Sequence, residues 1–250
     1  MDIKAYLNRI GIEKINDPSL KFLTELQNRH LLSIPFEDLD IPDGNRIELD
    51  LNKIYNKIIP SRRGGFCYEL NGLFHWLLTS LGFNVDMLSA RVFNSQKNDF
   101  GPEYDHMTLL VHLDKDYLVD VGFGDSFRRP IEMPDGETED ISGHYRISKK
   151  EDKLFELLKK EVDDFSSQYC FTKDPKKLED YKKMCAFQQD SPASHFRTRM
   201  LCTIATETGR ITLSNNSLTI TENGIKTKTE FTSDNEFYFL LNKHFGITLD

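Results

Sequence analysis

The sequence predicts an α+β fold, in which helices come first, strands follow and the final segment contains both. Through the first 81 residues, apolar side chains recur at spacings of three and four, which is the period of a helix buried along one face. Beyond residue 84, apolar and polar side chains alternate in short runs, as they do in half-buried strands. Helices and strands separated along the chain in this way favour an α+β fold over an alternating α/β fold.

Three helices are predicted in the first third, each from a start signal followed by an apolar stripe. Two of them open on an aspartate, whose carboxylate accepts hydrogen bonds from the free amides of a first helical turn. The third carries the longest apolar stripe, and Gly82 closes it in the usual place for a left-handed cap. The expected helix starts are Asp17, Asp50 and Cys67.

The remainder of the chain is read mainly as strands. Strands are predicted over 85–92, 107–113, 117–121, 199–206, 210–214, 217–221 and 225–231. Residues 144–160 fit a helix or a strand equally well, and a charged helix is expected over 175–187. A capping box at Ser233–Glu236 opens a final helix that ends at Gly246.

The composition excludes several classes of function. With 32 basic and 40 acidic residues, the net charge is −8, so the overall field opposes binding to nucleic acid or to an anionic membrane. No apolar run approaches the roughly 20 residues that span a bilayer, and the N-terminus lacks the blocks of a secretion signal. A cytoplasmic protein with four free thiols is therefore expected. No metal-ligand spacing or phosphate-binding loop is present, so no metal is expected.

Cys67 is the first candidate for chemistry. Two glycines precede it, and it falls on the first turn of the strongest predicted helix. The free amides and the helix dipole favour a thiolate there, and Arg62 and Arg63 add positive charge. The alternative is a small buried thiol with a packing role, because free cysteines are among the most buried residues.

A thiolate nucleophile needs a base, and the base needs a group that orients it. His106 is the best placed of seven histidines, at the start of a predicted strand, whereas His30, His75 and His195 lie in apolar patterns typical of core histidines. Asp120 interrupts an apolar strand, where a carboxylate either pairs for structural reasons or holds a histidine.

The predicted hairpin leaves a geometric difficulty. If residues 114–116 form a three-residue loop, Asp120 lies opposite Leu110, four residues from His106. The two side chains would then be roughly 13 Å apart along the strand, too far for a hydrogen bond. A bulge, another register or a bend before His106 has to close this distance.

Five ordered segments resemble the arylamine N-acetyltransferases, in the bacterial form of that family. The segment Arg63-Gly64-Gly65-Phe66-Cys67-Tyr68-Glu69-Leu70-Asn71 is similar to the family's nucleophile motif, and Asp120-Val121-Gly122-Phe123-Gly124 is similar to its acidic motif. His106 stands where the family's histidine is expected. The other two segments are His30 with Ile34-Pro35-Phe36-Glu37-Asp38-Leu39, and Ser191-Pro192-Ala193-Ser194-His195-Phe196.

The resemblance implies three domains around a cysteine catalytic core like those of papain and transglutaminase. They are a helical domain over 1–84 that carries the nucleophile, a β-barrel over 85–187 that carries histidine and aspartate, and an α/β lid over 188–250. The family's fold also implies that Cys67, His106 and Asp120 come together as a catalytic triad.

The implied activity is transfer of an acetyl group from acetyl-CoA, as cosubstrate, to an arylamine or arylhydrazine through an acetyl-cysteine. Further roles follow from the same resemblance. The residues expected to line the acceptor pocket are Phe36, Phe66, Val92, Phe93 and Phe123. Contacts to CoA are expected from Gly122, Gly124 and Phe196. An ion pair between Arg63 and Glu37 is expected to brace the loop that presents Cys67.

Other functions are compatible with the same candidate residues. Macrolactam-forming amide synthases resemble the same family and use the same triad. A cysteine protease or a transglutaminase-like enzyme would use water or a glutamine amide, and the family motifs argue against both. A non-catalytic protein that binds CoA or arylamines would be expected to have a broken triad, whereas all three residues are present here. The oligomeric state and the physiological amine stay open.

Overall fold

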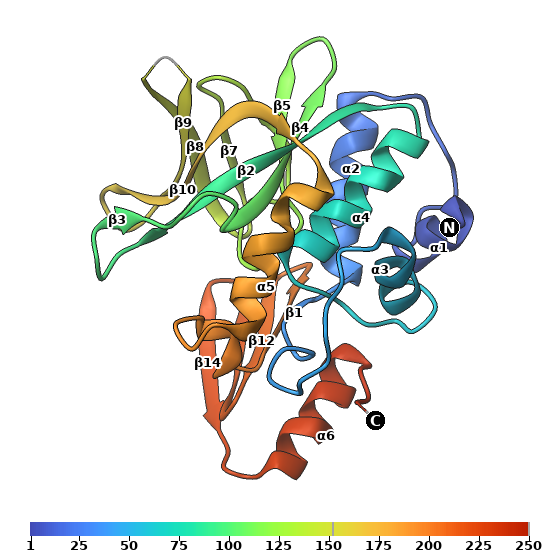
Figure 1. Cartoon of the computed structure of the whole chain (residues 1–250), viewed down its shortest axis with the longest axis vertical. Helices are drawn as coiled ribbons and strands as arrows, with labels where there is room; N and C mark the ends of the chain where they lie inside the picture. The colour runs from blue at the N-terminus through green and yellow to red at the C-terminus, as the bar shows by residue number, and fades with distance from the viewer. Residues whose placement is uncertain (152, 250) are drawn as a thin grey trace.

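Helices from the first third of the chain pack beside a curled sheet, and a smaller sheet with one long helix closes the lower end of the molecule (Figure 1). The computed structural model describes residues 1–151 and 153–249. The fold is α+β, as the sequence predicts. Helix α5 and the loop that follows it run from the curled sheet down to the smaller sheet.

The helical part contains α1 (Ile3–Arg9), α2 (Leu20–Ser33), α3 (Leu51–Ile58) and α4 (Cys67–Ser80). Asp50 caps α3 as predicted, because its Oδ1 accepts the amides of Asn52 and Lys53 at 2.9 and 3.0 Å. The predicted start of α2 at Asp17 is wrong. Ser19 is the cap, and its Oγ accepts the Phe22 amide at 3.3 Å.

The curled sheet follows α4. Its strands are β2 (Asn84–Asn94), β3 (Asp99–Phe100), β4 (His106–His112), β5 (Asp116–Val119), β6 (Ile131–Glu132), β7 (Glu137–Asp140), β8 (Gly143–Glu151), β9 (Leu154–Lys160) and β10 (Phe165–Lys176). The strand order is β6-β5-β4-β2-β10-β9-β8-β7, with β3 beside β2. The edge strands β6 and β7 contact each other, so the sheet is nearly closed into a barrel. The ambiguous stretch 144–160 is therefore a pair of strands.

The helix predicted over 175–187 is wrong in its first half. Strand β10 continues to Lys176, and a 3-10 turn (Leu178–Tyr181) separates it from α5 (Lys182–Asp190). The pairing of β10 with β2 shifts register between Phe171 and Pro175. Proline has no amide to donate to the ladder, so within a sheet it is tolerated where the regular pairing is already interrupted.

The smaller sheet comes from both ends of the chain. It contains β1 (Phe36–Glu37), β11 (Leu201–Thr206), β12 (Gly209–Ser214), β13 (Ser217–Glu222) and β14 (Ile225–Glu230), in that order. Helix α6 (Asp234–Phe245) covers one of its faces around a core that includes Cys202, Leu213, Phe237 and Leu241. Gly246 ends α6, as the sequence predicts, and forms a left-handed cap with φ of +65°. A short 3-10 helix (His195–Arg197) leads into β11.

The largest hydrophobic core joins helices to barrel strands. Side chains of α4 such as Tyr68 and Leu73 pack in one cluster with Met107 of β4 and Val119 of β5. The boundary drawn at residue 84 thus crosses a continuous core, and the three-domain division stays a prediction. Because α4 and β4 share this core, their ends are fixed relative to each other, and the candidate residues lie there.

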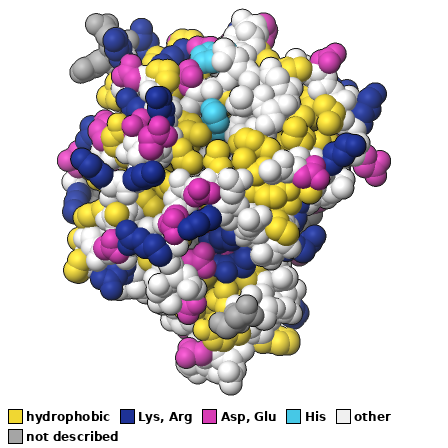
Figure 2. Space-filling model, turned by 45° about the vertical axis from the view of Figure 1, so that its right-hand side comes forward, with side chains coloured by type: hydrophobic (Ala, Val, Ile, Leu, Met, Phe, Trp, Pro, Cys, Tyr) yellow, Lys and Arg dark blue, Asp and Glu magenta, His cyan; other side chains and the backbone are white. Residues whose placement is uncertain are grey.

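The surface mixes charges of both signs. On the face in Figure 2, basic and acidic side chains alternate with hydrophobic ones. No helix in residues 1–151 and 153–249 is long and apolar enough to cross a membrane.

Candidate active site

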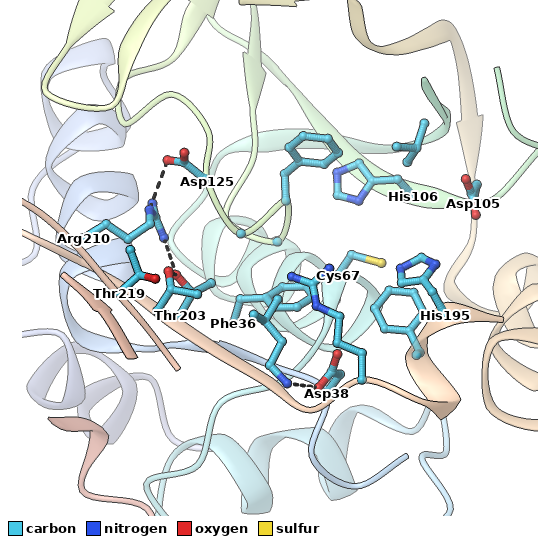
Figure 3. Close-up of a pocket in the computed structure, with 18 of the residues that line it drawn as sticks. Phe36, Asp38, Cys67, Asp105, His106, Asp125, His195, Thr203, Arg210 and Thr219 are labelled. Carbon is cyan, nitrogen blue, oxygen red and sulfur yellow. Dashed lines mark hydrogen bonds and ion pairs between the residues drawn. The ribbon is translucent and has the colours of Figure 1, made fainter. Parts of the chain in front are cut away.

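Cys67 is the first residue of α4 and faces a cavity. The loop before it is fixed by Glu69, whose Oε2 accepts the Phe66 amide at 3.1 Å. The cavity has a volume of about 440 Å³ and is also lined by His106 and Asp105 of the β4 region. Figure 3 shows the Cys67 sulfur lying between the rings of His106 and His195. The predicted placement of this cysteine at a helix start is therefore confirmed.

His106 and Asp120 form a short hydrogen bond. The His106 Nε2 lies 2.7 Å from the Asp120 Oδ2, and both side chains are buried. The difficulty with the hairpin disappears because the turn sits one residue earlier than expected. His112 pairs with Asp116 and Leu109 with Val119, which places Asp120 beyond Val119, opposite Thr108. The histidine is then two residues along the strand rather than four, within reach on the same face.

Asp120 is held by three further donors. Its Oδ1 accepts the Asn71 side-chain amide and the Gly122 backbone amide, each at 2.9 Å, and its Oδ2 accepts the Tyr169 hydroxyl at 3.0 Å. Burial alone would raise the pKa of Asp120, but His106 and these donors together lower it below its usual range. The carboxylate is therefore ionised at neutral pH and fixes the orientation of the imidazole.

Asn71 and Tyr169 were missed as functional residues. Asn71 is fully buried in α4, donates to Asp120 and to the Met107 carbonyl, and accepts the Val121 amide at 3.0 Å. An amide in the apolar stripe of a buried helix is a signal that the sequence does contain, because such a group needs partners. Tyr169 lies on β10, and nothing in its local pattern indicates that it reaches β5.

The Cys67 thiol is not acidic by itself. Burial raises its pKa well above the usual value, the Met107 backbone amide opposes this, and Asp105 and Asp120 raise it further. The expected help from arginine is absent: Arg63 is turned toward Glu37 and Asp40, and Arg62 is exposed. Loss of the thiol proton therefore requires a neighbouring base, and His106 lines the same cavity.

Gly122 allows the acidic strand to approach the nucleophile closely. A Cβ at this position would lie 2.8 Å from the Cys67 Cα and 2.6 Å from the Asn71 Nδ2. Both distances are shorter than normal contacts, and the first involves backbone that cannot yield easily. The glycine two residues after Asp120 is thus a packing requirement for bringing the aspartate and the cysteine together.

The comparisons with known proteins agree with this geometry. The family model for N-acetyltransferases matches residues 19–250. Arylamine N-acetyltransferase 2 of Mus musculus is 32% identical over 278 aligned positions, which cover 100% of this chain and 95% of the mouse protein. The chain belongs to the arylamine N-acetyltransferase family. The resemblance inferred from its motifs is confirmed, and membership makes it an acyltransferase.

Solved arylamine N-acetyltransferases share the whole fold. The Salmonella typhimurium enzyme has a TM-score of 0.93 at 30% identity, over 99% of this chain and 92% of that one. A Bacillus cereus arylamine N-acetyltransferase has a TM-score of 0.91 at 30% identity, over 100% of both chains, and its structure reveals a Cys-His-Glu catalytic triad. In the present arylamine N-acetyltransferase the carboxylate bonded to histidine belongs to an aspartate, Asp120.

The ion pair predicted between Arg63 and Glu37 is present in this family member. Arg63 donates from Nε to Glu37 Oε1 at 2.9 Å and from Nη2 to Asp40 at 2.8 Å. Lys57 joins the cluster, bonding Asp40 at 2.7 Å and Glu69 at 3.0 Å. Because Glu69 also holds the Phe66 amide, the charge cluster supports the loop that presents Cys67.

The residues predicted to line the acceptor and CoA sites fall into two groups. Those that line the cavity are Phe36, Val92, Gly122, Phe123, Gly124 and Phe196. Phe66 and Phe93 do not line it. Phe66 is fully buried and packs edge-on against Phe196, with ring centroids 6.2 Å apart, and Phe93 packs on Phe100 at 5.2 Å.

Of the three histidines predicted to be core residues, His30 and His75 are buried or partly buried, and His195 is not. His30 is a core residue, bonded to the Tyr6 hydroxyl at 2.8 Å, and burial lowers its pKa to about 3. His75 is partly buried and contacts the Val85 carbonyl. The prediction for His195 is wrong: it is exposed, lines the cavity and lies on the Phe196 ring at 4.2 Å. The preceding Ser194 caps a 3-10 helix that begins at His195.

The described part of the chain contains no set of side chains arranged to bind a metal ion. No group of three or more histidine, cysteine, aspartate or glutamate side chains is placed there to hold an ion. All four cysteines are free thiols, as expected.

Proposed function

We propose that this protein transfers an acetyl group from acetyl-CoA to an arylamine or arylhydrazine by a ping-pong mechanism through an acetyl-cysteine at Cys67. The observation that carries the proposal is the cavity where Cys67 at a helix start meets His106, itself bonded to Asp120 at 2.7 Å. A buried thiol with a raised pKa needs a base of this kind to become a nucleophile.

In the first half-reaction, His106 takes the Cys67 proton and the sulfur attacks the thioester carbonyl. The carbon–sulfur bond to CoA breaks, and the protonated imidazole returns its proton to the departing CoA thiolate. Asp120 stabilises the imidazolium and keeps the ring in one orientation. Gly122, Gly124 and Phe196 supply the cavity wall along which the CoA arm would lie.

The oxyanion formed in this step would lie against the backbone amides of the first turn of α4. In the described part of the chain, the backbone amides of Cys67 and Tyr68 have no hydrogen-bond acceptor, because they precede the first intrahelical bonds. Free amides at a helix start stabilise developing negative charge without reorganising. They are the proposed oxyanion donors.

In the second half-reaction, the amine attacks the acetyl-cysteine. An arylamine is neutral at pH 7, since its lone pair is delocalised into the ring, so it needs no deprotonation before attack. His106 accepts the proton that the nitrogen loses as the amide forms, and the Cys67 thiolate leaves. Phe36, Val92 and Phe123 provide an apolar wall for the aromatic ring.

The test is intact-protein mass after brief incubation with acetyl-CoA and no amine. Wild type is expected to gain one acetyl group, which an arylamine then discharges. Cys67→Ala is expected to gain none. Cys170→Ala, which removes a thiol buried on β10, is the matched control and is expected to behave as wild type.

An equal gain by Cys67→Ala would place the acetyl group on another residue and would contradict the mechanism. A gain in wild type that water discharges as fast as an arylamine would indicate a hydrolase instead.

A further inference from the structure

A residue in an unusual backbone conformation lies two positions before His106. Residues Pro102 to Asp105 form a turn, in which the Asp105 amide donates to the Pro102 carbonyl at 3.4 Å. Tyr104, inside this turn, has φ of +66°. This left-handed region suits glycine, whereas the Cβ of any other residue crowds the following carbonyl oxygen there. The conformation of Tyr104 therefore needs support from its surroundings.

Two buried side chains fix the peptide groups on either side of Tyr104. The Tyr68 hydroxyl donates to the Tyr104 carbonyl at 2.6 Å and lies 3.4 Å from the Asp105 carbonyl. The Tyr104 amide donates to the Ser89 Oγ of β2 at 2.8 Å. Any change in φ or ψ at residue 104 rotates these two planar peptide groups relative to each other, so at least one of the bonds would break. The two side chains thus stabilise the left-handed conformation.

The Tyr68 side chain is itself held in place by its neighbours. It is fully buried, and its ring packs edge-on against Phe66 with centroids 4.9 Å apart and against Tyr181 at 5.4 Å. Tyr181 also packs edge-on against the Tyr104 ring, at 5.2 Å. Tyr68 is not among the described residues that line the cavity. Its hydroxyl is therefore placed to act on the turn and not on a substrate.

The backbone of this turn determines where His106 presents its free ring nitrogen. Nε2 is bonded to Asp120 at 2.7 Å, so Nδ1 is the nitrogen left for the Cys67 sulfur, which lies beside the ring (Figure 3). Nδ1 is the ring nitrogen nearer to the backbone, and the bond to Asp120 prevents the ring from rotating to compensate for a backbone shift. A displacement of about 1 Å between reacting groups can cost about a hundredfold in rate.

The nucleophile and the residue that supports this turn are consecutive in the sequence. Cys67 and Tyr68 both belong to the first turn of α4. The cysteine faces the cavity, while the tyrosine reaches the loop that leads into β4. One turn of helix therefore sets the position of the sulfur and also supports the backbone from which the base extends.

We propose that the Tyr68 hydroxyl positions His106 for proton transfer with Cys67, by holding Tyr104 in its left-handed conformation. This inference rests on the proposed function, in which His106 exchanges a proton with Cys67. Tyr68 is a positioning residue, because it acts through the backbone of Tyr104 and Asp105. Without the hydroxyl, the Tyr104 carbonyl loses this donor, and the turn is expected to relax toward negative φ and to move His106.

The test follows two reactions of Cys67 by intact mass: alkylation by iodoacetamide between pH 6 and pH 10, and acetylation by acetyl-CoA. Tyr68→Phe removes the hydroxyl and keeps the ring and the backbone. Alkylation at pH 7 and acetylation are each expected to fall about tenfold, the upper range for one hydrogen bond. The part of the alkylation rate that rises with hydroxide above pH 9 is expected to stay as in wild type, because it needs no imidazole. A hydroxyl that only stabilised the fold would lower the thermal unfolding midpoint and leave this pH profile unchanged.

Tyr104→Gly shows whether the effect passes through residue 104. Glycine adopts positive φ without strain, so the turn then depends less on the hydroxyl. The loss caused by Tyr68→Phe is expected to be at least about threefold smaller in a Tyr104→Gly background, a coupling that a double-mutant cycle measures.

Tyr55→Phe is the matched control. The Tyr55 hydroxyl also donates to a backbone carbonyl, that of Asp2 at 3.2 Å, but it lies on α3 and not beside the turn. Both rates are expected to equal those of wild type.

Each outcome has one meaning. A loss in Tyr68→Phe at pH 7 that shrinks in the Tyr104→Gly background supports the proposal. Wild-type rates in Tyr68→Phe, an equal fall at every pH, or a loss that does not shrink in the second background overturns it and leaves the proposed function intact.

Two further results are also decisive. If Tyr68→Phe does not fold, Ser89→Ala, which removes the acceptor of the Tyr104 amide, is measured by the same criteria, and wild-type rates in it overturn the proposal. If wild type forms no acetyl-enzyme, the proposed function fails, while the alkylation profile still decides whether Tyr68 positions His106.

Discussion

The Asp120 carboxylate accepts hydrogen bonds from four elements of the fold. Its donors come from α4 through Asn71, from β4 through His106, from β10 through Tyr169 and from the loop after β5 through Gly122. A buried carboxylate with this many donors is ionised and immobile. The side chain therefore has little freedom to adapt to a change of length or charge.

Replacing Asp120 tests both properties. Asp120→Asn is expected to lower kcat/KM for acetyl transfer by a factor on the order of 10³–10⁴, because the amide cannot stabilise the imidazolium. Asp120→Glu keeps the charge but adds a methylene to a packed site, so an intermediate activity is expected. Steady-state rates and thermal unfolding are measured together, with Asp114→Asn in the nearby turn as control. Wild-type activity in Asp120→Asn would show that the aspartate has a structural role only.

Single functional residues were predictable from the sequence where the neighbouring residues carry the signal. Cys67 was indicated by glycines and a helix start, and Asp120 by a charge inside an apolar strand. Tyr169 was not, because its role depends on β10 pairing with β2, far along the chain. His195 was misread because an apolar pattern does not reveal that a capped 3-10 turn begins there and lies at the cavity.

At the scale of elements, the junction between β1 and β11 connects the nucleophile loop to the smaller sheet. Asp38, immediately after β1, accepts the Leu201 amide at 2.7 Å through Oδ1, while its buried Oδ2 has no partner among the described residues. Burial raises the pKa of Asp38 to about 7, against an ordinary value of 3.8. Ionisation of Asp38 is thus unfavourable in the folded protein, at the point where β1 meets the start of β11.

The sign of the resulting pH effect follows from linkage. A carboxyl whose pKa is raised by folding stabilises the native state fully below pH 3.8, and this contribution is lost as pH rises through about 7. The free energy of unfolding of wild type is expected to fall between pH 5 and pH 8 by on the order of a few kcal/mol more than that of Asp38→Asn. Urea unfolding at the two pH values measures it, with exposed Glu13→Gln as control. Equal pH dependence in wild type and Asp38→Asn would contradict the assignment.

Elements with strong local signals were predicted, and those governed by pairing were not. The cap at Asp50 follows from one side chain, and the end of α6 at Gly246 follows from the backbone freedom of glycine; both were predicted correctly. The hairpin turn was placed one residue too late, which shifted the pairing of Asp120 by two residues, because a loop of charged residues does not reveal which of its members pair. The end of β10 was assigned to a helix because Pro175 is equally typical of a helix start and a strand irregularity.

For the molecule as a whole, the smaller sheet and α6, which form the predicted lid, have a separate and smaller core. The main core contains α1 to α4 together with strands of the barrel, whereas the lid core is formed by the small sheet and α6. All six residues of β14 are exposed. A region with few buried apolar contacts opens at lower free energy than the rest of the structure.

Loss of activity is therefore expected to precede global unfolding. The single tryptophan, Trp76, packs against the main core, so its fluorescence reports that core and not the lid. In a urea titration, the midpoint for acetyl transfer is expected at a lower concentration than the midpoint for Trp76 fluorescence. Coincident midpoints would show that lid and main core unfold as one unit.

The distribution of sulfur has a consequence for exposure to oxidants and alkylating reagents. Cys170, Cys185 and Cys202 are 1%, 2% and 0% exposed, and Cys67 is 5% exposed. Cys67 lines the catalytic cavity together with His106, whereas Cys185 lines a second cavity, where burial raises its pKa to about 12. A reagent that enters the catalytic cavity meets one thiol with an imidazole beside it, whereas Cys185 has no such base in its cavity lining and stays protonated. Alkylation of the folded protein is thus expected at one atom: an iodoacetamide-sized electrophile would silence turnover with unit stoichiometry while thermal stability stays intact. Only unfolding would make all four thiols available.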